Sequence, residues 1–102
     1  MILAQVVGTV VSTRKDSGLL GLKLLLARQV DQDIQPTGSW VVAADAVGAG
    51  IGELVLIAAG SSARLTETTR DKPVDSVISG IVDHIESNGR TIYQKHLGAE
   101  AK

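Results

Sequence analysis

The residues best placed to do chemistry surround a glycine loop, where Asp45 and Glu53 flank Gly48, Gly50 and Gly52. A carboxylate pair suggests acid–base catalysis, and a glycine-rich loop suggests a cradle for phosphate. A dinucleotide site, however, needs the pattern G-x-G-x-x-G followed by a helix. Here the pattern is G-x-G-x-G, and residues 54–57 have β-type composition. We therefore interpret the loop as a tight connection between strands, or a contact surface, whose open backbone N–H groups are accepted by the two acids.

A metal site is the second chemistry that the sequence allows. The histidines, His84 and His96, fall in different segments, and Asp83 and Glu86 lie close to His84. On a strand the side chains of Asp83 and His84 point to opposite faces. Because a metal site needs at least three converging ligands, we expect no bound metal.

A short segment with two serines is the third candidate. Ser61 and Ser62 follow Gly60, and Arg64 closes the segment. The order differs from the G-x-S-x-G nucleophile elbow, and no motif places a base beside either serine. Capping of a helical turn explains the serines better. Arg64 can hold a small anion, but an inter-subunit salt bridge or carbonyl contact explains it better. We predict no catalytic residue, no cofactor and no enzymatic activity.

Composition narrows the class of protein. The 102 residues carry a net charge of −1, contain no cysteine or phenylalanine, and are 44% hydrophobic. A nucleic-acid surface needs a basic stripe with aromatic platforms, and this chain has only Trp40 and Tyr93. The apolar N-terminus lacks the basic region of a signal peptide, so we expect a first strand and no membrane segment. The many aliphatic residues favour assembly into an oligomer.

The elements that must position these residues are short strands. We expect strands over residues 2–13, 19–30, 40–45, 53–58, 74–86 and 91–95. The first bends at Gly8, and helix competes with strand for the second and the fifth. A single helical turn follows at 60–64, and Asn88-Gly89 is typical of a type I′ hairpin turn. This pattern predicts a mainly β domain over residues 1–95, a small barrel or sandwich, with a flexible tail over 96–102.

Five motifs in order carry a resemblance to a known family. They are Gly8-Thr9-Val10-Val11-x-Thr13-x-Lys15, Lys23-Leu24-Leu25, Ala44-Asp45-x-Val47-Gly48-Ala49-Gly50-x-Gly52-Glu53-x-Val55, Gly60-Ser61-Ser62-Ala63-Arg64 and Pro73-Val74-Asp75. Over residues 1–86 the chain resembles the vertex proteins of bacterial microcompartments, the carboxysome and ethanolamine-type shell pentamers. The resemblance implies a five- to six-stranded barrel of oligonucleotide-binding-like topology, with a short helical turn and a C-terminal hairpin, but without nucleic-acid binding.

The resemblance also implies a structural role in the cytoplasm. Five copies would form a ring at the fivefold corners of a shell tiled by hexameric proteins, and would supply its curvature and closure. The implied interface residues are Asp45, Gly48, Ala49, Gly50, Gly52, Glu53 and Arg64, and the implied residues at the central pore are Gly60, Ser61 and Ser62. A β-barrel module that binds a small anion or metabolite remains the alternative.

Overall fold

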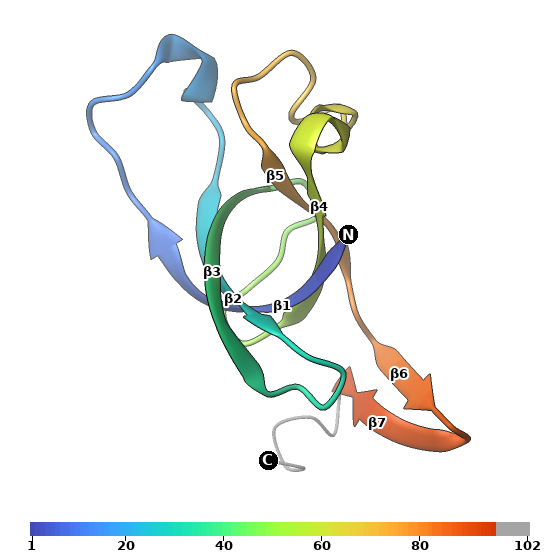
Figure 1. The fold of residues 1–102 in the computed structure, drawn as a ribbon. Coiled ribbons are helices and arrows are strands. Elements are labelled where there is room, and N and C mark those ends of the chain that lie inside the picture. The colour runs from blue at the N-terminus through green and yellow to red at the C-terminus, as the bar shows by residue number, and fades with distance from the viewer. Residues whose placement is uncertain (96–102) are drawn as a thin grey trace.

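The computed structural model describes residues 1–95 of the chain. Within them, five strands close a barrel in the order β1-β2-β3-β5-β4, and two further strands form a separate hairpin (Figure 1). The barrel strands are β1 (Ile2–Val10), β2 (Leu24–Val30), β3 (Pro36–Asp45), β4 (Leu54–Ala59) and β5 (Ser76–Ile81). Neighbouring strands are antiparallel except β3 and β5, which are parallel. The prediction of a small, mainly β barrel is confirmed, and the sandwich is excluded.

The barrel interior is a packed aliphatic core. Three alanines without exposed surface, Ala4, Ala27 and Ala43, face inward beside Leu25 and Ile57. Because alternate residues of a strand point to one face, small side chains at these positions let the strands close a narrow barrel. Each fully buried leucine or isoleucine stabilises the fold by about 1.5–3 kcal/mol.

Strand ends differ from the prediction where tertiary pairing decides them. The first strand ends at Val10, the last residue that pairs with β2, and the register between them shifts between Val6 and Gly8 as the expected bend requires. Residues 19–23 are not strand: the 3₁₀ helix η1 (Ser17–Leu19) precedes Gly21, whose φ of +83° turns the chain. The loop expected over 31–39 is shorter, because β3 already begins at Pro36.

The strand expected over residues 74–86 is two strands. β5 ends at Ile81, and β6 (His84–Ser87) starts after a short break that leaves the barrel. β6 pairs with β7 (Arg90–Gln94) through a turn in which Asn88 and Gly89 have φ of +54° and +76°. Positive φ at both central residues is what a type I′ turn requires, so the predicted hairpin is confirmed. The predicted tail, 96–102, lies outside the described residues.

A second, smaller core lies on the outside of the barrel. Ala44 of β3 and Val77 of β5 pack against Ala63 of the 3₁₀ helix η2 (Gly60–Arg64). The helical turn is confirmed, but the predicted cap by Ser61 or Ser62 is wrong, because the N-cap is Ala59 and makes no side-chain bond. Near the other end of η2, the buried Thr69 hydroxyl donates to the carbonyl of Ala63 at 2.5 Å.

Candidate functional site

The first half of the loop between β3 and β4 is folded around the carboxylate of Asp45. Its Oδ1 accepts the N–H groups of Val47, Gly48 and Ala49 at 3.1 Å each, and Oδ2 accepts that of Ala49 at 3.0 Å. Lys23 Nζ lies 3.8 Å from Oδ2 and donates to the Ala49 carbonyl at 3.2 Å. The Asp45 side chain is only 3% exposed. Its predicted role as acceptor for the loop backbone is confirmed.

Glu53 holds the second half of the same loop. Its Oε1 accepts the N–H of Gly50 at 2.6 Å, and its Oε2 lies 2.7 Å from Nζ of Lys95. The hydrogen bond from Lys95, followed by that from Gly50, lowers the pKa of Glu53 below its ordinary value of 4.5. The same contact raises the pKa of Lys95. A carboxylate that is ionised and occupied in this way supports the backbone and is poorly suited to donate a proton.

The loop closes one end of the barrel. The Ala49 side chain, 1% exposed, belongs to the barrel core. The N–H of Gly52 donates to the carbonyl of Val6 at 2.8 Å, and the N–H of Val6 donates to the carbonyl of Glu53 at 3.0 Å. Gly52 has φ of +89°, a conformation that favours glycine. The arrangement fixes a shape and leaves little for chemistry.

The structure separates the predicted interface residues into four groups. Gly48 and Gly52 are exposed and Gly50 is half-buried, so these glycines present loop backbone to the outside. The side chains of Asp45 and Ala49 are buried inside their own chain. Glu53 is half-buried. Arg64 lies elsewhere, on η2, and is exposed.

Arg64 lines an open hollow of about 720 Å³ that also contains Ser61. Two acids, Asp16 and Asp71, and a second base, Lys72, share its wall. This mixture of charges does not select for an anion. The three residues predicted to face a central pore, 60–62, are exposed, and Ser61 is the one that lines this hollow.

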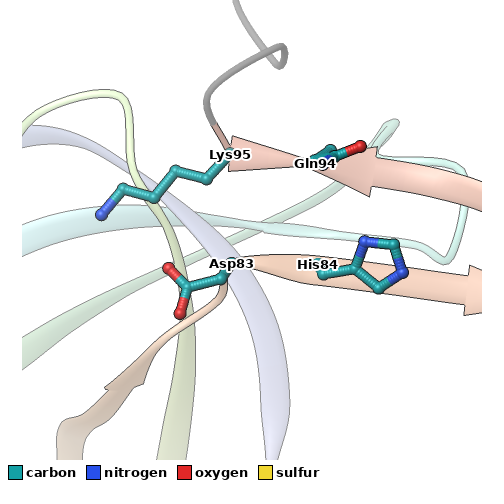
Figure 2. A pocket seen from close by; sticks show the side chains of 4 residues that line it. All are labelled: Asp83, His84, Gln94 and Lys95. Atoms are coloured by element: carbon teal, nitrogen blue, oxygen red, sulfur yellow. The ribbon is translucent and has the colours of Figure 1, made fainter.

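The histidine predicted as a weak metal candidate lies on the hairpin. His84 lines a second hollow, of about 540 Å³, with Asp83, Gln94 and Lys95. Figure 2 shows Asp83 and Lys95 pointing to the barrel side, whereas the His84 ring lies along the hairpin. His84 Nε2 is 3.4 Å from Glu86 Oε2. In residues 1–95 no three metal-binding side chains converge, and no helix there is long and apolar enough to cross a membrane.

Sequence reasoning missed the long-range partners of the loop. Three other segments supply these partners, which are Gln5, Lys23 and Lys95. The Nε2 of Gln5 donates to the Gly52 carbonyl at 3.3 Å. Local spacing carries no signal for such contacts. Reasoning from the residues also missed that Trp40 is 60% exposed. Trp40, Val42 and Ala44 share one face of β3, but Val41 and Ala43 on the other face are also apolar, so the sequence pattern does not distinguish the outer face.

The chain resembles proteins of one family throughout the barrel. Residues 1–83 match the family described as ethanolamine utilisation protein EutN/carboxysome. The carboxysome shell vertex protein CcmL of Synechocystis is 45% identical over 95 residues, covering 93% of this chain and 95% of CcmL. The bacterial microcompartment shell vertex protein EutN of Escherichia coli K12 is 43% identical, covering 93% of this chain and all of EutN.

Solved structures of the same kinds of shell protein share the fold of this chain. The structure of CcmL from Gloeobacter violaceus has a TM-score of 0.90 at 42% identity, covering 94% of this chain and 99% of CcmL. The GrpN pentameric microcompartment shell protein from Rhodospirillum rubrum has a TM-score of 0.77 at 44% identity, covering 85% of this chain and 98% of GrpN.

Proposed function

Because the chain belongs to the ethanolamine utilisation protein EutN/carboxysome family, we propose that it forms the pentameric vertex of a bacterial microcompartment shell. The observation that carries this proposal is the match along nearly the full length of relatives named shell vertex proteins. A pentameric shell protein is among the solved structures with the same barrel. The site of action is the shell itself, inside the cytoplasm.

The vertex acts through its shape. A flat sheet of hexamers cannot close, and a fivefold element at each corner supplies the missing curvature. A cyclic ring joins each copy to the next through two different surfaces, so the subunit must hold both surfaces in a fixed relation. The closed barrel, with its loop fixed from inside by Asp45 and Glu53, supports that requirement.

The predicted interface residues fall into two roles in this proposal. Gly48, Gly50 and Gly52 allow a neighbouring copy to approach the loop backbone closely. Asp45, Ala49 and Glu53 act from within, by holding the loop in the shape that the neighbour contacts.

The second predicted surface is the η2 side. Gly60, Ser61 and Ser62 face the ring axis and its narrow pore in this proposal, and Arg64 anchors that turn against the adjacent copy. Hexameric shell proteins are the remaining partners, and they meet the outer rim of the ring. The acids of the loop are occupied by backbone contacts, which supports a structural role and argues against an enzyme.

Native mass spectrometry of the purified protein tests the ring directly. We expect a dominant species of five chains at micromolar concentration. Co-expression with a hexameric shell protein should then give closed particles in electron micrographs, whereas the hexamer alone should give open sheets or tubes. A monomer or dimer in the first measurement would contradict the proposed function.

A further inference from the structure

The β6–β7 hairpin is a two-stranded sheet that does not pair with any strand of the barrel. It forms a sheet of its own and extends away from the barrel, in a subunit that measures 45 × 23 × 23 Å (Figure 1). Its base is held by Lys95, which donates its N–H to the carbonyl of Asp83 and its ammonium to Glu53. Farther out, Ile85 lies opposite Tyr93. An isolated two-stranded hairpin is marginally stable in water, so this one needs a partner surface.

The first part of β3, residues 36–43, lacks a pairing partner on one of its two edges within residues 1–95. β5 reaches β3 only at Ala44 and Asp45, so within the described residues the earlier part, 36–43, pairs with β2 alone. No other strand of residues 1–95 pairs with its opposite edge, where the backbone presents N–H and C=O groups. On this part Trp40 is 60% exposed and Val42 is 46% exposed. A free edge with large apolar side chains is a site where another chain adds.

The two surfaces also complement each other in charge. Arg28 lies opposite Trp40 in the β2–β3 ladder and donates both its Nε–H and its Nη2–H to the neutral amide oxygen of Gln5. Its charge therefore faces no carboxylate in residues 1–95. On the hairpin the Glu86 carboxylate is 65% exposed, and its partner His84 is charged only when protonated. The Arg28 guanidinium of one copy and the Glu86 carboxylate of the next therefore attract each other when the two surfaces meet.

We propose that the β6–β7 hairpin of one copy docks along the free edge of β3 of the next copy. Ile85 and Tyr93 then cover Trp40 and Val42. This inference rests on the proposed ring, in which each copy meets the next through unlike surfaces, and it adds the hairpin and the β3 edge to the loop and η2 contacts. One copy presents a projecting hairpin and the next a bare edge, so five copies satisfy all hairpins and all edges together.

Cysteine cross-linking tests the contact, because the natural chain contains no cysteine. Ser39→Cys on β3 is combined with Arg90→Cys on β7, both at exposed positions on the face opposite Trp40 and Tyr93, and the protein is treated with a short bis-maleimide. A second pair, Thr37→Cys with Arg90→Cys, samples a register two residues away. A denaturing gel should show a ladder from one to five chains. The matched control, Glu67→Cys with Arg90→Cys, places its first thiol on an exposed loop and should give no ladder.

The outcomes separate this inference from the proposed function. A pentamer by native mass spectrometry with a ladder in either β3 pair, and none in the control, supports the docking. A pentamer whose β3 pairs give only monomer, including a monomer cross-linked within itself, overturns the docking and leaves the vertex function standing. Absence of a pentamer in the cysteine-free protein overturns the proposed function, and the docking with it.

Discussion

Removing the carboxylate of Asp45 should loosen the loop that closes the barrel. Asp45→Ala deprives the N–H groups of Val47, Gly48 and Ala49 of their acceptor. Val47 and Gly48 are exposed, so water replaces part of the loss, whereas the Ala49 residue is buried. Hydrogen bonds to a charged group contribute about 1.5–3 kcal/mol, and an unsatisfied buried donor costs about 1–3 kcal/mol. We expect a total of about 3 kcal/mol, and a melting temperature lower by roughly 10–20 °C.

Urea unfolding followed by circular dichroism measures this loss. All variants are compared at one protein concentration, because assembly adds stability that depends on concentration. Asp45→Asn is the matched control: its amide oxygen still accepts the loop N–H groups, so it should lose only about 1 kcal/mol. An Asp45→Ala protein within about 0.5 kcal/mol of the parent, a range typical of unimportant surface positions, would refute the reasoning. If the fold kept its stability but the ring was lost, Asp45 would instead contact the neighbouring copy directly.

Three further predictions concern the loop and the hairpin. Because the pKa of Glu53 is lowered, the ionised Glu53 carboxylate contributes fully to folding stability above pH 4.5, and this contribution is lost as pH falls through the folded-state pKa. The unfolding free energy of the Glu53→Gln variant, measured in urea at about pH 6 and about pH 3, should therefore change less with pH than that of the parent. Gly52→Ala should lower the unfolding free energy of the dissociated subunit by about 1–2 kcal/mol because φ is +89°. Gly50→Ala, whose new Cβ would meet Glu53 at an ordinary 3.5 Å, should change the same quantity by no more than about 0.5 kcal/mol, and equal costs for the two variants would contradict the backbone argument. Tyr93→Ser should raise the dissociation constant of the ring at least about tenfold, a loss of about 1.4 kcal/mol. The fluorescence emission of Trp40 in this variant should lie at longer wavelength than in the parent ring. If the intact parent ring emitted at the wavelength of a solvent-exposed tryptophan, the result would count against burial of the Trp40 side chain.

The parts of the fold that could be predicted are those encoded by neighbouring residues. Asn88 and Gly89 are adjacent, and their φ preferences alone specify the hairpin turn. The acceptor role of Asp45 was equally local, since the N–H groups that it binds lie two to four residues away.

What could not be predicted depends on segments distant in the sequence. β3 begins at Pro36 because Val30 offers it a partner, and no composition rule encodes that register. Lys95 reaches Glu53 only after the hairpin has folded back to the barrel. The wrong cap at Ser61 had a different cause: a short 3₁₀ helix entered through Gly60 at φ +68° does not form the N-cap geometry of an α-helix.

The order of the strands also determines when a new chain can become a barrel. β5 is the only barrel strand that pairs with both β3 and β4, so it closes the cylinder. On the ribosome β1 to β4 are made first, and their open edges at β3 and β4 wait for residues 76–81 to emerge. Unpaired edges in a partly made chain are where aggregation begins. A chain whose translation stalls or ends between β4 and β5 is therefore an open, aggregation-prone sheet, whereas the completed chain folds into a closed barrel.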